Sequence, residues 1–197
     1  GDVYKRQPGR GGVSVIRMSG ANAKAIAEDM CGGLAQSWKF RKCKIKSTDG
    51  LVLDSGLVVF FESPHSYTGE DVVEFHCHGN PTIVNLIVED VVKRGAVIAE
   101  PGEFTKTAFL NDKIDLAQAE SVSDLINAQS KSAVIAANSS LSGNFSSSVD
   151  LIIRGLVSTR VMIEAHIDFP EEEIDSDLLE SISYELSGFS KDIDRLL

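Results

Sequence analysis

The hydrophobic pattern changes its period partway along the chain, and this change constrains the fold more than any other feature. Up to about residue 110, short apolar runs alternate with polar residues and are separated by glycine and proline, a pattern typical of strands mixed with helices. From Ser130 onward, apolar residues recur at steps of three, four and seven, which indicates one face of a helix. The sequence therefore predicts an α+β fold.

The elements expected from this pattern follow one another closely. We expect strands over residues 13–20, 51–64, 71–79 and 96–102, and helices over residues 21–34 and 80–95. In the second helix, Asn80 is the expected N-cap and Gly95 the C-terminal stop. A helical turn over 104–110 and a helix from Asp115 come next, then one long helix from Ser130 with a weak point at Gly143, an interruption at Pro170 and a last helix. We therefore divide the chain into a mixed α/β domain, residues 1–112, and an incomplete α-helical bundle, residues 113–197.

Composition and charge exclude several classes of protein. The longest apolar run, residues 57–61, is too short to span a bilayer, and the first residues do not form a secretory signal. The odd number of cysteines, three, is typical of reduced thiols, so we expect a cytoplasmic protein. Residues 1–50 hold ten basic and four acidic residues, but the whole chain has a net charge of −10. A chain this acidic is not expected to hold nucleic acid by bulk counterion release, so another segment or partner would have to supply a basic surface for RNA.

The glycine-rich stretch PGRGGVSVIRMSG, residues 8–20, raises the question of nucleotide binding. A phosphate-binding loop needs a lysine followed by serine or threonine, and a helix after it. Here the glycines lead into a strand pattern, which also argues against a dinucleotide fingerprint. We interpret the stretch as a turn that precedes a strand from which Arg17 projects, and expect no nucleotide site in it.

The strand VVEFHCHG places Glu74, His76 and His78 on one face. A carboxylate with two imidazoles suggests a metal site. However, neighbouring side chains on one strand face lie about 7 Å apart, too far for all three to bind one ion without distortion. A hydrogen-bonding face is the better interpretation, since a carboxylate accepts paired N–H bonds from an amidine-like edge such as that of a pterin.

Lys113 lies in a polar break just before the helix that starts at Asp115. The helix dipole disfavours a cation at this end of a helix. The residue either meets an anion or a carbonyl group, or is simply solvated, and the pattern alone leaves both interpretations open.

Three segments together carry a resemblance to a known family: PGRGGVSVIRMSG, SYTGEDVVEFHCHGN and PGEFTKTAFLNDKIDLAQAE, with IDFPEEEID further along. The chain resembles the N-terminal part of the MnmE (TrmE) family of tRNA modification GTPases. The resemblance implies an N-terminal folate-binding domain similar to that of the glycine-cleavage T protein, followed by a helical domain. It also implies a homodimer that acts with the partner MnmG (GidA) on the wobble uridine (U34) of tRNA, with a reduced folate such as 5-formyltetrahydrofolate as the one-carbon donor.

The family's folate contacts fall on Arg17, Glu74 and Lys113 of this sequence. On physical grounds we expect Glu74 to pair with the amino and N3–H edge of the pterin, while the two cations hold its carbonyl or the formyl and carboxylate oxygens. The family's GTPase domain, with its GTP, magnesium and potassium sites, has no counterpart in this sequence, so we expect no catalytic residue and no GTP hydrolysis from it.

Three positions depart from the family pattern. Residues 1–7 replace its first strand and are interpreted as foreign, so we expect an edge strand to be missing or imperfect there. Asn80 replaces a glycine, and asparagine tolerates a left-handed backbone best among the other residues. Thr107 replaces a commonly basic residue at a surface contact.

Two alternatives stay open beside the folate-binding function. One is a metal-dependent enzyme built on Glu74, His76 and His78, and the other is a purely structural dimerisation module. Stoichiometric zinc or iron in the purified protein would favour the first, and a reduced folate that fails to stabilise the protein would favour the second.

Overall fold

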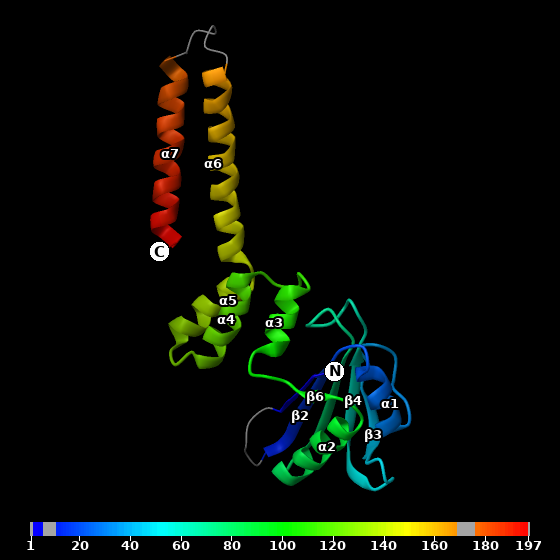
Figure 1. Cartoon of the computed structure of the whole chain (residues 1–197). Helices are drawn as coiled ribbons and strands as arrows, with labels where there is room; N and C mark the ends of the chain where they lie inside the picture. The colour runs from blue at the N-terminus through cyan, green and yellow to red at the C-terminus, as the bar shows by residue number, and fades with distance from the viewer. Residues whose placement is uncertain (1, 6–10, 169–175, 197) are drawn as a thin grey trace. The chain divides into compact units, whose positions relative to one another are not determined.

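The computed structural model describes residues 2–5, 11–168 and 176–196. The chain forms two compact units, Gly1–Ile114 and Asp115–Leu197 (Figure 1). The first unit is built on a mixed sheet and the second on helices, which confirms the predicted α+β class. The roles assigned to residues 1–112 and 113–197 stay predictions.

In the described part of the first unit, six strands form one sheet in the order β3-β4-β5-β2-β1-β6. Neighbouring strands pair antiparallel, except that β1 and β6 run parallel. The strands are β1 (Asp2–Lys5), β2 (Gly11–Ser19), β3 (Arg41–Lys46), β4 (Val52–Phe61), β5 (Val72–Gly79) and β6 (Val97–Ile98).

Two strands differ from the sequence-based expectation. The first residues were expected to lack a proper strand, yet β1 pairs with β2 on one side and β6 on the other. Strand β3 is not predicted from its sequence, because lysine is uncommon in strands. Its buried residues, Cys43 and Ile45, nevertheless alternate with exposed lysines at the strand period.

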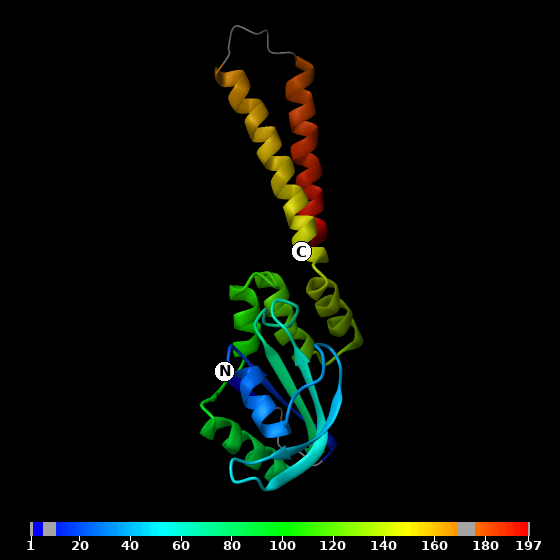
Figure 2. The same ribbon diagram turned by 90° about the vertical axis from the view of Figure 1, so that its right-hand side faces the viewer.

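Two helices cover one face of the sheet and close the main core. Helix α1 (Ala23–Cys31) ends at Gly32, and α2 (Pro81–Lys93) begins at Asn80. The Asn80 side chain accepts a hydrogen bond from the backbone N–H of Thr82, which confirms the predicted N-cap; its φ of −104° is extended rather than left-handed. Ile16, Met18 and Phe75 of the sheet are fully buried against these helices, and Figure 2 shows α1 (blue) lying against the strands.

The glycine-rich stretch forms part of the sheet rather than a turn alone. Residues 8–10 lie outside the described residues, but Gly11 and Gly12 already belong to β2. Gly11 pairs with Gly79 at the end of β5. A Cβ on Gly79 would collide with the backbone of Gly11, so a side chain there would push the two strands apart.

The remaining helices include a complete break at Gly143, where the sequence predicts only a weak point in one long helix. Gly143, with φ of 79°, separates α5 from α6, so the expected long helix is two helices. Helices α6 and α7 run side by side in opposite directions (Figures 1 and 2). The interruption expected at Pro170 lies outside the described residues. These helices are α3 (Glu103–Leu110) in the first unit, and α4 (Leu116–Asn127), α5 (Lys131–Leu141), α6 (Asn144–Asp168) and α7 (Ser176–Leu196).

None of the described helices combines the length and the apolar character needed to cross a membrane.

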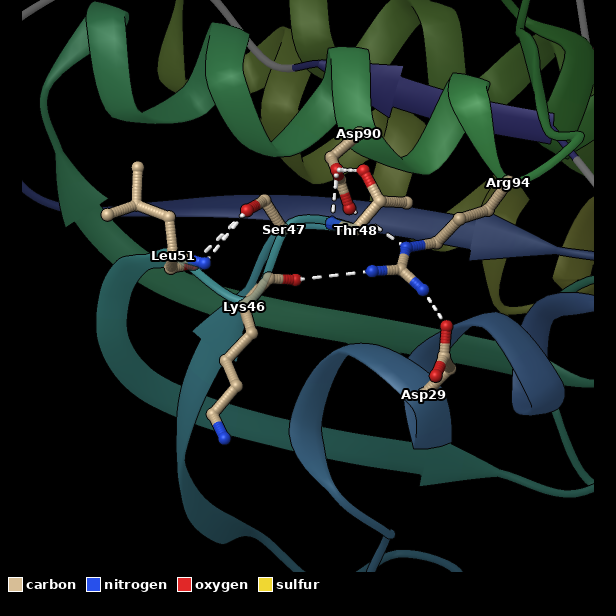
Figure 3. A network of polar contacts seen from close by, with 7 residues as sticks. All are labelled: Asp29, Lys46, Ser47, Thr48, Leu51, Asp90 and Arg94. Carbon is tan, nitrogen blue, oxygen red and sulfur yellow. Dashed lines mark hydrogen bonds and ion pairs between the residues drawn. The ribbon is translucent and has the colours of Figure 1, made fainter.

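A buried ion pair at the end of α2 ties three segments of the first unit together (Figure 3). Arg94 donates to Asp90 at 2.8 Å and also pairs with Asp29 of α1. Asp90, which is 3% exposed, accepts two further hydrogen bonds from the backbone and hydroxyl of Thr48, at 2.9 and 3.1 Å. The carbonyl of Lys46 accepts from Arg94 at 3.5 Å. The network therefore holds α1, α2 and the β3–β4 turn to one another.

Replacing Asp90 by alanine is expected to destabilise the first unit by about 3 kcal/mol, because a buried arginine loses a partner and the Thr48 donors lose their acceptor. Urea unfolding followed by Trp38, the only tryptophan of the sequence, measures this unit. Glu89→Ala, which removes an exposed carboxylate from the neighbouring position, is the control. Equal stabilities of the two variants would contradict the role given to the network.

Candidate functional site

The second face of the sheet, opposite α1 and α2, carries the polar residues singled out in the sequence. Arg17 of β2 lies directly across from Glu74 of β5 in the strand register. The Arg17 guanidinium donates through Nε and Nη2 to one carboxylate oxygen, Glu74 Oε1, at 2.7 and 2.5 Å. The Arg17 side chain is 38% exposed and that of Glu74 only 12%. The pair is therefore half-buried, with the cation nearer the solvent.

His76 extends this polar row along β5. Its Nε2 lies 3.1 Å from Glu74 Oε2, the carboxylate oxygen that Arg17 leaves free. The ring of Phe40 meets the imidazole edge-on, with the centroids 5.2 Å apart. Glu74 is thus held from both sides, by a guanidinium on one oxygen and an imidazole on the other.

Two aromatic rings border the Arg17 guanidinium. The centroids of Tyr67, in the loop 62–71, and of Phe104, in α3, each lie 5.9 Å from its central carbon. Tyr67 is itself fixed by a 3.0 Å hydrogen bond between its hydroxyl and that of Thr105. The arrangement combines a charged hydrogen-bonding edge with aromatic surfaces, a combination suited to a flat polar ligand.

Lys113 holds the same loop at another point. Its ammonium donates to the carbonyl of Pro64 at 2.9 Å, and the Asn111 amide donates to the carbonyl of Thr68 at 2.7 Å. The structure thus brings Arg17 and Glu74 into direct contact and relates Lys113 to them through the loop 62–71. The carbonyl contact agrees with one of the two interpretations left open for Lys113.

The three side chains of the alternative metal site, Glu74, His76 and His78, do not converge. His78 turns to Asp54 of β4, with its Nδ1 2.8 Å from Oδ1, and its side chain is 67% exposed. Among the described residues, no group of three histidine, cysteine, aspartate or glutamate side chains is placed to hold a metal ion. The geometry gives the metal-dependent alternative no support.

Sequence reasoning missed the residues that shape the loop beside the site. The Ser19 hydroxyl bonds that of Thr68 at 2.7 Å and donates to Glu70 at 2.8 Å. Ser19 and Thr68 are both buried. Ser19 stands two residues after Arg17 and so shares its strand face, which is a signal that the sequence did contain. Tyr67 and Phe104 carried no such signal, because their approach to Arg17 depends on the path of the loop and of α3.

Asp54 of β4 is held by hydrogen bonds from β5 and from its own strand. Burial alone would raise its pKa, but hydrogen bonds from the backbone N–H and ring of His78 and from the N–H of Ser55 outweigh it, so the pKa lies below its ordinary value. A carboxyl whose pKa is lowered by folding stabilises the protein fully above the unfolded pKa, about 3.9, and loses this contribution as the pH falls through the folded pKa.

Asp54→Asn is therefore expected to lower the unfolding free energy by roughly 2 kcal/mol at pH 7. The asparagine side chain has one carbonyl oxygen, and its NH₂ group would face the N–H donors that Asp54 now accepts from His78 and Ser55. The difference from the parent protein shrinks toward pH 3, where the parent carboxylate begins to take up a proton. Urea midpoints at the two pH values measure it, with the exposed Asp49→Asn as control. A cost that does not change with pH would contradict the assignment.

Comparison with known proteins places the chain in a family. Residues 5–113 match the family model described as GTP-binding protein TrmE N-terminus, and residues 116–197 match the MnmE helical domain. A relative from Neisseria meningitidis serogroup B (strain ATCC BAA-335 / MC58), named tRNA modification GTPase MnmE, is 45% identical over 96% of this chain and 42% of its own length. Relatives of the same name from Hydrogenovibrio crunogenus and Nitrosomonas eutropha are 49% and 47% identical over 85% of this chain and 37% of theirs.

The chain thus spans well under half the length of these curated relatives. Both family models match at adjoining positions, and together they cover nearly all of the sequence. The chain belongs to the MnmE (TrmE) family of tRNA modification GTPases.

Proposed function

We propose that this chain is the folate-binding and dimerising part of a cytoplasmic tRNA modification GTPase. The full protein would act as a homodimer with MnmG on the wobble uridine of tRNA. GTP, magnesium and potassium would bind in the GTPase domain of that full protein. The observation that carries the proposal is the half-buried Arg17–Glu74 pair, bordered by Tyr67 and Phe104 on the face of the sheet opposite the main core.

The donors and acceptors of this site fit a reduced folate such as 5-formyltetrahydrofolate. Glu74 Oε1 is occupied by Arg17, whereas Oε2 lies beside the His76 ring and keeps a lone pair for an N–H of a pterin edge. The half-exposed guanidinium keeps donors for a carbonyl or carboxylate oxygen. Of the three ammonium donors of Lys113, one is used by Pro64. A bound folate would supply the one-carbon unit, and these residues would hold and orient it.

Glu74→Gln is expected to weaken the binding of 5-formyltetrahydrofolate roughly tenfold to hundredfold, because a charged acceptor is replaced by an amide that also donates. Isothermal titration calorimetry measures the change. Glu89→Gln, an exposed carboxylate on α2, makes the same chemical substitution away from the site and should bind like the parent. Equal affinities for the two variants would remove Glu74 from the site.

The same ligand separates this function from a purely structural dimerisation module. A folate that binds only the folded chain must raise its melting temperature with concentration. We expect such a rise together with the mass of a dimer in size-exclusion chromatography with light scattering. A dimer whose melting temperature does not change with folate concentration would favour the structural module instead.

A further inference from the structure

Strand β3 presents a row of lysines at the edge of the sheet. Its Cys43 and Ile45 are buried in the core, so Lys42, Lys44 and Lys46 must project from the opposite face, and all three are exposed. Successive lysines on one face lie about 7 Å apart along the strand. In Figure 3 the Lys46 side chain extends away from the polar network that its carbonyl joins. We call these three lysines the basic strip.

The basic strip is a local positive surface on an acidic chain. Residues 32–48 contain five basic residues and no aspartate or glutamate, whereas the whole chain has a net charge of −10. The net charge argues against binding a polyanion by the chain as a whole. Charges more than about 10 Å from the strip are largely screened at ordinary ionic strength. Of the nearer carboxylates, Asp54 is paired with His78 and Asp90 with Arg94.

Two aromatic side chains stand exposed just before the strip. Trp38 is 63% exposed and Phe40 59%, which is unusual for rings of this size. Each is held in place by another ring: Trp38 meets Phe61 edge-on at 4.7 Å, and Phe40 meets His76 in the same way. Exposed aromatic faces beside lysines are the combination with which proteins bind single-stranded nucleic acid.

The backbone of Trp38 has an unfavourable, left-handed conformation. Its φ of 66° is rare for a bulky residue. A hydrogen bond from its N–H to the carbonyl of Phe60 at 2.8 Å keeps it there, and the Ser37 hydroxyl accepts from the N–H of Glu62 at 3.0 Å. A strained residue that is tied down while its ring stays exposed suggests a role for that ring outside the fold.

Lysines on an edge strand also have a simpler use, because they keep the edge from pairing with another sheet. That use accounts for the basic strip but not for the two exposed rings beside it. An acidic protein partner would likewise use the lysines, so polyglutamate serves as a competitor that stands in for such a partner.

We propose that the basic strip, with Trp38 and Phe40, binds a single-stranded stretch of RNA, the lysines contacting phosphates and the rings stacking on bases. The choice of RNA over another polyanion rests on the proposed function, and the surface itself rests on charge, exposure and ring geometry. Phe40 packs on His76, which contacts Glu74, so the lysine variant is the one that distinguishes this surface from the folate site.

The test uses the 197-residue chain and a fluorescein-labelled, unstructured 12-nucleotide RNA, with fluorescence anisotropy measured between 50 and 200 mM salt. The triple variant Lys42→Gln, Lys44→Gln, Lys46→Gln should bind at least tenfold more weakly than the parent. The slope of log affinity against log salt should fall by about 2, since each phosphate contact to a single strand contributes about 0.7. Trp38→Leu with Phe40→Leu should weaken binding about tenfold and leave the slope unchanged.

The matched control removes three exposed lysines elsewhere: Lys93→Gln, Lys106→Gln, Lys131→Gln. This triple variant carries the same net charge and should bind RNA like the parent. Weakening equal to that of the strip variant, no RNA binding by the parent at 50 mM salt, or equal competition by polyglutamate would each overturn the proposal. The strip variant should still bind folate, whereas a parent that binds RNA but no folate would refute the proposed function alone.

Discussion

The antiparallel pairing of β2 with β5 is the constraint on which the rest of the first unit depends. It sets Arg17 opposite Glu74 on one face, and on the other face it buries Ile16 and Phe75 under α1 and α2. Side chains alternate along a strand, so a slip of β2 by one residue against β5 would send Arg17 into the core and Ile16 out of it. The cost of burying unpaired charges protects the register, and the same register assembles the candidate site.

One face of the sheet forms the main core, and the other carries the candidate site. On the core face, the Arg94 network joins α1, α2 and the β3–β4 turn. Helices α1 and α2 both lie on this face, so neither covers the opposite one. That opposite face carries the Arg17–Glu74–His76 row at its centre and the basic strip at one edge. Polar and exposed aromatic groups collect there because the core face has already supplied the hydrophobic burial that the fold requires.

Sequence reasoning succeeded where a single segment carries the whole signal. The alternation in β5 and the N-cap at Asn80 follow from local chemistry, and the structure has them as expected. It failed where contacts with distant segments determine the structure. Strand β1 forms because β2 and β6 lie on either side of it, and His78 leaves the row on β5 because Asp54 of β4 offers it a carboxylate.

The sequence by itself determined the α+β class, the faces of β2 and β5, and the family, since each of these depends on order and spacing along the chain. Only the tertiary structure decided which candidates meet: Arg17 with Glu74 directly, Lys113 through the carbonyl of Pro64, and Tyr67 and Phe104 beside the guanidinium. These contacts join residues far apart in the chain. Their distances are fixed by how the loop 62–71 and α3 pack on the sheet, and no local pattern encodes that packing.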